Sequence, residues 1–237
     1  MKSIKELLKI RELEKILGFK IKNKNIWLTA VTHKSWLFFN PEIKLPHNER
    51  LEFLGDSVLQ VITSWYLYIH FPHLSEGELS LIRSALINRQ RLGEIAQKLK
   101  IEKFLLIGKN LDSKGLKTVL GNSLEAIIGA IFLDLGFEKA KEFIEKNILV
   151  DIEKIVKEKK YKDPKSLLQE IFQEKYKEQP EYKIIEITGP PHQRNFKVAL
   201  YLKNKKLTEA EGSSKKEAEI NAALKVLQKS PESILDF

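Results

Sequence analysis

Apolar residues recur at helical spacing through the first 158 residues or so of the chain. The repeat is clear over residues 24–36, from about 47 to 71, and again over 117–137, which predicts helices with an apolar face or with apolar residues nearly all round. Residues 75–78 have the form of a capping box, with Ser75 as N-cap and Glu78 reaching back, and should open a further helix. A loop containing Gly108, Asp112 and Gly115 is expected before residue 117. No segment in this part alternates as a strand does, so an all-α domain is predicted.

The pattern changes after a highly charged connector at residues 156–163. Asp163 followed by Pro164 predicts an N-cap with proline at the first helical position, and Pro180 should end that helix. Residues 181–187, 195–202 and 206–212 are predicted as three short strands, the second alternating between apolar and polar positions. Residues 213–229 are predicted to form a last amphipathic helix. The order α-β-β-β-α predicts an antiparallel sheet that buries one face under both helices.

The chain of 237 residues, 43% of them hydrophobic, is long enough for one large or two modest domains. We expect an all-α domain over residues 1–158, a linker at 159–162, a small α+β domain over 163–230 and a C-terminal tail at 231–237. The N-terminus is charged throughout and lacks the apolar core of a signal peptide. No uninterrupted apolar run approaches the roughly 18 residues of a membrane span, so no membrane partner is expected.

The net charge of +9 makes a polyanionic partner plausible, although many unrelated proteins are equally basic. Most of the excess lies before residue 160, so nucleic-acid binding by the small domain would depend on a few placed cations. The chain has no cysteine, which excludes disulfides and thiolate metal sites and fits a cytoplasmic location. Any metal would have to be a hard ion held by oxygen atoms.

Acidic residues interrupt two of the predicted helices. Glu49, Glu52 and Asp56 fall within about 60° of one another on a helical projection, opposite an apolar stripe, and the simplest interpretation is a solvated face. Glu125, however, lies in a segment that is apolar nearly all round. A buried carboxylate needs a cation, either a basic side chain such as Arg83 or a metal ion. The small residues Ala126 and Gly129 beside it leave room for an approaching group.

If the two segments pack together, Glu52, Asp56, Asn122 and Glu125 would form an all-oxygen pocket. Such a pocket suits Mg²⁺, which takes a few carboxylates together with water and phosphate oxygens. Two ions in this arrangement can activate a water and stabilise the leaving oxygen of a phosphodiester. A structural salt bridge remains the alternative.

The last predicted helix carries Lys215 and Lys216 in its first turn, where the helix dipole disfavours cations. Lysines at this position make sense if a phosphate lies in front of them, and the alternative is a merely solvated pair. His192, in the turn between two strands, could reach a groove or simply be exposed.

These segments together resemble the ribonuclease III family. The segments "NERLEFLGDSVL" and "GNSLEAIIGAIFLD" resemble its two catalytic signatures, and "THKSW" and "EGELSLIRSALIN" lie where the family has similar stretches. The C-terminal part, with "DPKSLLQE", "GPPH" and "GSSKKEAE", resembles its double-stranded-RNA-binding domain. The resemblance covers nearly the whole chain in order.

The resemblance implies a homodimeric endoribonuclease that requires Mg²⁺, for which Mn²⁺ should substitute, and no small-molecule cofactor. It implies cleavage of double-stranded RNA to 5′-phosphate and 3′-hydroxyl ends with short 3′ overhangs, in processing of ribosomal precursors and structured messages. The matching positions fall into several groups. The positions matching metal ligands are Glu52, Asp56, Asn122 and Glu125, of which Asp56 and Glu125 match the pair most closely tied to catalysis. Glu49 and Glu76 match acids at the edge of the substrate cleft. Phe53 matches an aromatic residue at the dimer interface. In the small domain the matching positions are Ser166, Gln169, Glu170 and Gln173 for one minor groove, His192 for the next, and Lys215 and Lys216 for the phosphates between them.

One position departs from the family, because Asn122 stands where aspartate is usual. Asn122 could be a native variant that keeps activity with altered metal dependence. It could instead leave a dimer that binds double-stranded RNA and cuts it poorly, so a binding module is the competing function.

Overall fold

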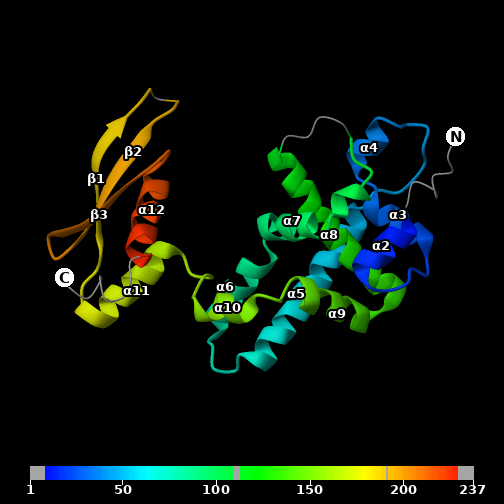
Figure 1. Cartoon of the computed structure of the whole chain (residues 1–237), viewed down its shortest axis with the longest axis horizontal. Coiled ribbons are helices and arrows are strands. Elements are labelled where there is room, and N and C mark those ends of the chain that lie inside the picture. The colour runs from blue at the N-terminus through cyan, green and yellow to red at the C-terminus, as the bar shows by residue number, and fades with distance from the viewer. Residues whose placement is uncertain (1–8, 109–112, 191, 229–237) are drawn as a thin grey trace. The chain divides into compact units, whose positions relative to one another are not determined.

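The computed structural model describes residues 9–108, 113–190 and 192–228, and the chain divides into two compact units, Met1–Tyr161 and Lys162–Phe237 (Figure 1). In the described part, the first unit is built from helices and one short 3-10 turn. They are α2 (Ile10–Leu17), α3 (Lys24–Val31), α4 (Lys34–Phe38), α5 (Glu49–His70), α6 (Glu76–Ile87), α7 (Arg89–Lys98), η1 (Ile101–Lys103), α8 (Ser113–Leu135), α9 (Phe137–Asn147) and α10 (Ile152–Lys157). The predicted all-α fold of this part is confirmed.

Helix α8 lies in the middle of this unit and packs against α3, α5, α7 and α9 (Figure 1). Residues 115–135 are long and apolar enough to cross a bilayer by length and composition alone. Two thirds of the most apolar window of this helix are buried inside the unit, which is how the core helix of a globular domain behaves. The predicted apolar segment therefore supplies the core around which the other helices pack.

Two helix boundaries differ from the prediction. The helical repeat over residues 24–36 is divided between α3 and α4, because Thr32 pairs with Leu106 in an isolated parallel bridge and His33 caps α4. Gly115, predicted in a loop, lies in the first turn of α8, which begins at Ser113. Asp112 of the same predicted loop lies outside the described residues. The capping box of Ser75 and Glu78 is present as predicted at the start of α6.

The charged connector also differs from its prediction. Helix α10 continues to Lys157, and Tyr161, predicted within the linker, is buried in the core of the N-terminal unit. The Tyr161 hydroxyl donates to a carboxylate oxygen of Glu78 at 3.4 Å. The first unit therefore reaches Tyr161, and Lys162 belongs to the second unit.

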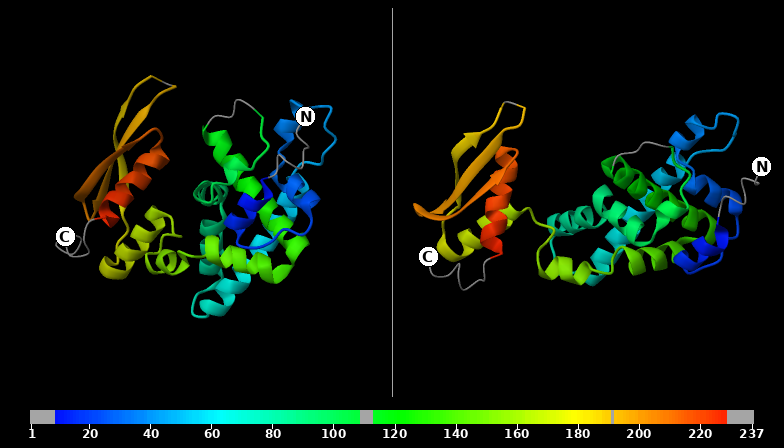
Figure 2. Two further views of the ribbon diagram at one scale, coloured as in Figure 1. Left: turned by 45° about the vertical axis from the view of Figure 1, so that its right-hand side comes forward. Right: turned by 45° about the horizontal axis from the view of Figure 1, so that its top comes forward.

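The second unit has the predicted α-β-β-β-α order. It consists of α11 (Pro164–Tyr176), β1 (Glu181–Thr188), β2 (Asn195–Leu202), β3 (Lys205–Gly212) and α12 (Lys215–Leu227). The strands form an antiparallel sheet in the order β1-β2-β3, and both helices lie on one face of it (Figure 2). Phe172 of α11, Leu200 of β2 and Ala222 of α12 meet in its core. The predicted tail at 231–237 lies outside the described residues.

Candidate active site and nucleic-acid interface

Helices α5 and α8 cross in direct backbone contact at Gly55 and Gly129. A Cβ atom built on Gly55 would lie 1.7 Å from the carbonyl oxygen of Glu125, and one on Gly129 would lie 2.4 Å from that of Leu51. Any larger residue at either position would push the helices apart. The room that the sequence predicts beside Gly129 is therefore filled by α5 itself, which corrects the expectation that another group approaches there.

This crossing brings together the oxygen-bearing side chains predicted from the sequence. Glu52 and Asp56 lie within one turn of Gly55 on α5, while Asn122 and Glu125 precede Gly129 on α8. The four side chains line one open cleft of about 590 Å³. The cleft is completed by His33, Lys34, Glu49, Phe53, Ile87, Asn88 and Arg89. The packing on which the predicted pocket depends is thus present.

The salt bridge proposed as an alternative for Glu125 is not formed. Arg83 donates instead to the hydroxyl of Ser64 at 2.8 Å. Across the described residues, no basic side chain lies within 4.0 Å of the carboxylates of Glu52, Asp56 or Glu125. In the described part of the chain, the charges of these three carboxylates are therefore not neutralised by direct ion pairs.

Glu125 carries the strongest electrostatic perturbation of the site. It is only 7% exposed, and burial, followed by repulsion from Asp56 and Glu52, raises its pKa to about 7 against a weaker opposing effect of Arg89. Burial also raises the pKa of Glu52, which Arg89 and a hydrogen bond from Asn122 partly offset. Both carboxylates therefore favour a nearby cation.

Asn122 presents an unused acceptor to the same cleft. Its side-chain oxygen is buried and has no hydrogen-bond partner, while its amide group bonds to Glu52. A buried acceptor without a partner costs free energy, and a divalent cation or its water would satisfy it. The donor set, three carboxylates and one amide oxygen, fits a hard ion such as Mg²⁺.

The acids are not drawn together into a ready-made cluster. Among the described residues, no three His, Cys, Asp or Glu side chains are placed closely enough to hold one metal ion. Repulsion from Asp56 and Glu52 raises the pKa of Glu125, after the larger effect of burial, and a bound cation would relieve this repulsion. The donor atoms and the shared cleft suit a divalent ion, and binding of the ion would have to draw the carboxylates closer to one another.

The predicted edge residues separate into two groups. Glu49 lines the cleft and is paired with Lys34, whose Nζ lies 2.7 Å from its carboxylate and lowers its pKa. Glu76 lies at the start of α6, accepts a hydrogen bond from Ser80 at 2.9 Å and is not among the residues lining the cleft. The structure of one chain therefore does not place Glu76 where the resemblance implies.

Phe53, expected at a dimer interface, is 77% exposed although it lies directly beside the acids on α5. It borders a second, mainly apolar pocket. Lining residues of this pocket are Ile26, Thr29, Pro46, His47, Glu49, Arg50, Leu51, Leu54 and Leu133. A large exposed aromatic ring beside an apolar hollow is typical of a protein–protein contact.

Arg89 was not among the residues predicted for the site. This residue begins α7, whose N-cap is Asn88, and α7 also packs on α8 through glycine, since a Cβ on Gly121 would lie 2.8 Å from the carbonyl oxygen of Arg89. The close packing brings a guanidinium beside Glu52 and Glu125. The N-cap residue Asn88 and the glycines of α8 can be recognised in the sequence, but they do not show that α7 packs against α8 beside the acids.

In the second unit, the four residues predicted for a minor groove form one exposed face. Ser166, Gln169, Glu170 and Gln173 line a single shallow groove on α11 with Glu174 and Lys177. His192 is exposed beyond β1. The α11 prediction therefore describes a continuous surface rather than scattered residues.

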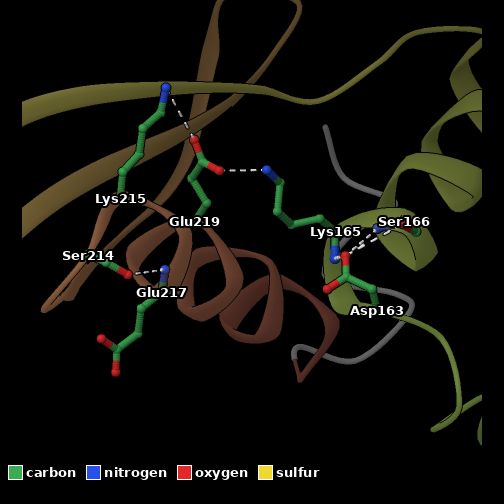
Figure 3. Close-up of polar contacts among 7 residues, drawn as sticks. All are labelled: Asp163, Lys165, Ser166, Ser214, Lys215, Glu217 and Glu219. Carbon is green, nitrogen blue, oxygen red and sulfur yellow. Dashed lines mark hydrogen bonds and ion pairs between the residues drawn. The ribbon is translucent and has the colours of Figure 1, made fainter. Parts of the chain in front are cut away.

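Lys215 and Lys216 are exposed in the first turn of α12, as predicted. Ser214 caps the helix by accepting from the backbone N–H of Glu217 at 3.2 Å. Lys215 is not simply solvated, however, because its Nζ lies 3.9 Å from Glu219 (Figure 3).

Comparison with known proteins agrees with both units. Residues 23–152 match a family described as Ribonuclease-III-like, and residues 164–230 match the double-stranded RNA binding motif. The chain is 42% identical to Ribonuclease 3 of Carboxydothermus hydrogenoformans, over 91% of this chain and 93% of that protein. It is 39% identical to Ribonuclease 3 of Dehalococcoides mccartyi, over 94% and 95% of the two chains.

Solved structures support the same assignment for the N-terminal unit. The nuclease domain of ribonuclease III from Campylobacter jejuni is 40% identical, with a TM-score of 0.53, and the match covers 60% of this chain and 95% of that domain. A second structure of that domain, 42% identical with a TM-score of 0.51, covers 59% and 98% and concerns flexibility in a region involved in its dimer formation. The chain, with its helical nuclease unit and double-stranded-RNA-binding unit, belongs to the ribonuclease III family.

Proposed function

We propose that this enzyme, an endoribonuclease acting on double-stranded RNA, hydrolyses phosphodiester bonds with two Mg²⁺ ions held by Glu52, Asp56, Asn122 and Glu125. The convergence of these four side chains at the Gly55–Gly129 crossing, with the pKa of Glu125 raised to about 7, carries the proposal. Such a site has an excess of negative charge, and within the described residues no basic side chain contacts Glu52, Asp56 or Glu125, so it suits divalent cations. Mn²⁺, another hard ion, should substitute.

The bound ions would supply an activated water and stabilise the leaving oxygen. The chain's own residues provide the orientation. Asp56 and Glu125 present carboxylate oxygens from opposite sides of the crossing, and Glu52 accepts from the Asn122 amide, which leaves the Asn122 oxygen free toward the cleft. Arg89 limits the repulsion among the acids. We expect products with 5′-phosphate and 3′-hydroxyl ends and short 3′ overhangs.

The orientation of Asn122 favours an active enzyme over a dimer that only binds RNA. An amide oxygen that is buried and unpartnered can replace a carboxylate oxygen as a neutral donor. With one negative charge fewer, the site should need more Mg²⁺ for half-maximal activity. Asn122→Asp should therefore lower the Mg²⁺ requirement.

Cleavage of a long RNA duplex tests the proposal. With Mg²⁺ the protein should yield short duplexes, and Glu125→Gln should abolish cutting while RNA binding persists. Glu42→Gln, an exposed carboxylate in the loop before α5, is the matched control and should cut normally. Undiminished cutting by Glu125→Gln would remove its proposed role, and a mobility shift without fragments from the unaltered protein would favour the binding-module alternative.

The proposal includes a homodimer in which Phe53 enters the apolar pocket bordered by Leu54 and Leu133 of a second copy. Exposure of the ring beside that pocket supports this pairing. Each subunit would then cut one strand of the duplex. Ribosomal precursors and structured messages in the cytoplasm are the proposed substrates.

A further inference from the structure

Glu219 of α12 is a carboxylate buried between the first turns of the two helices in the C-terminal unit. The residue is 9% exposed. One of its oxygens lies 2.5 Å from Nζ of Lys165 on α11, and the other lies 3.9 Å from Nζ of Lys215 on its own helix (Figure 3). A single acid thus links the helix assigned to the minor groove with a lysine assigned to phosphate.

Helix energetics do not explain why lysines occupy these positions. Lys165 and Lys215 both lie in the first turn of their helices, where the positive end of the dipole disfavours a cation. The pair of Lys215 with Glu219 also has its lysine on the N-terminal side, which is the weaker of the two orientations at this spacing. The local requirements of α11 are met separately, since Asp163 caps it by accepting from the N–H groups of residues 165 and 166.

Stability is a poor explanation as well. Burying a charged pair removes both groups from water, and apolar residues of similar volume often stabilise a fold as much or more. The ammonium of Lys165 is nevertheless held on two sides, by Glu219 and by the ring of Tyr182, whose centroid lies 4.8 Å away. This arrangement keeps Lys165 turned inward, with 35% of its side chain exposed against 62% for Lys215.

Lys165 and Lys215 therefore have different roles. Lys165 sits at 2.5 Å and neutralises the buried acid, whereas Lys215 at 3.9 Å is oriented by Glu219 without being locked to it. The ammonium of Lys215 can therefore bind a phosphate in front of α12 with little loss of free energy, because Glu219 remains paired with Lys165.

We propose that Glu219 and Lys165 form a positioning pair that holds Lys215 ready for phosphate at a set distance from the minor-groove face of α11. This inference rests on the proposed action on double-stranded RNA and on the RNA-binding roles that the family resemblance implies for α11 and Lys215. It adds that Glu219, a negative charge at an RNA-binding surface, strengthens binding.

The sign of the effect makes a sharp test. Glu219→Gln raises the net charge by one unit, so a nearby acid without a positioning role would weaken binding and its removal should tighten it. A positioning role gives the opposite result, and we expect binding about three- to tenfold weaker. Glu217→Gln is the matched control, because Glu217 lies two residues earlier, is exposed and bonds to Ser213 rather than to a lysine. It should bind as tightly as the unaltered chain or slightly tighter.

Binding is measured on the full chain with a fluorescent RNA duplex in chelator, which keeps the nuclease unit from cutting. A double-mutant cycle with Lys215→Ala then separates positioning from a general structural defect. If Glu219 acts through Lys215, Glu219→Gln should add little further loss in the Lys215→Ala background. Far-UV circular dichroism of each variant confirms that it is folded.

Three outcomes overturn the inference. Equal or tighter binding by folded Glu219→Gln contradicts it, and so do losses that simply add to that of Lys215→Ala. Unchanged binding by Lys215→Ala with Lys216→Ala would instead refute the proposed phosphate clamp on which the inference rests. If Glu219→Gln fails to fold, the cycle is run with Lys165→Gln, which should lose affinity through Lys215, while Lys165→Arg should retain it.

Discussion

The acidic cleft should lower the stability of the N-terminal unit at neutral and higher pH, and the stability of Glu125→Gln measures by how much. In the folded chain the pKa of Glu125 is raised from 4.5 to about 7. Below pH 4.5 Glu125 is protonated in both the folded and the unfolded chain, so the shift costs no stability. As pH rises from 4.5 through 7 the unfolded chain ionises first, and the folded chain loses stability relative to it. At about 1.4 kcal/mol per pKa unit, this shift costs about 3 kcal/mol of unfolding free energy at pH 8.

Glutamine has nearly the same shape and cannot ionise. Glu125→Gln should therefore match the unaltered chain near pH 4.5 and exceed its stability by about 3 kcal/mol at pH 8 in chelator. For a domain of this size that is about 6–12 °C in Tm. Mg²⁺ should narrow the gap by stabilising only the chain with the intact carboxylate.

Tryptophan fluorescence is a suitable assay because all three tryptophans, Trp27, Trp36 and Trp65, lie in the N-terminal unit. Urea unfolding at pH 4.5 and pH 8, with and without Mg²⁺, gives four free energies of unfolding for each chain. Glu42→Gln, on an exposed loop, should show no pH-dependent gain. A stability difference independent of pH, or a loss of stability at pH 8, would refute the reasoning about Glu125.

Three further predictions follow from the geometry. Gly129→Ala should destabilise the N-terminal unit by about 3 kcal/mol or more and abolish cleavage, because its Cβ would collide with the backbone of Leu51. Gly77, which has open space around it, provides the control: Gly77→Ala should change neither stability nor cleavage in the same urea and cleavage assays. Phe53→Asp should convert a homodimer to monomers in analytical ultracentrifugation, whereas Phe38→Asp, at an equally exposed ring, should not; a Phe53→Asp dimer would contradict the proposed interface. Lys215→Ala with Lys216→Ala should weaken binding of all RNA duplexes alike and flatten the salt dependence of affinity by about two units of slope, and a loss confined to certain sequences would exclude a phosphate clamp.

Local signals in the sequence were sufficient wherever the structure depends on neighbouring residues. The Asp163–Pro164 start of α11 and the Ser75 capping box are present where predicted, since each is a contact within one turn of chain. The predicted sheet and its two covering helices also agree, because the spacing of apolar residues depends only on local geometry.

Contacts between distant segments account for the differences. The split of α3 from α4 depends on the pairing of Thr32 with Leu106, and the burial of Tyr161 depends on a core assembled from earlier helices. The ion pair between Glu219 and Lys165 joins residues 54 positions apart. None of these partners can be identified from composition or period alone.

The glycine crossing links the stability of the nuclease unit with its chemistry. A glycine in a helix interior costs about 1 kcal/mol relative to alanine, and α5 and α8 each place one at their contact. The glycines permit a backbone approach close enough to bury Glu125 beside the acidic face of α5. Burial, followed by repulsion from Asp56 and Glu52, raises the pKa of Glu125 and lowers the stability of the folded chain at neutral and higher pH. Both costs fall on the same few residues. The combination is accounted for if the cleft is stabilised by bound cations, so the fold and its proposed metal site are expected to depend on each other.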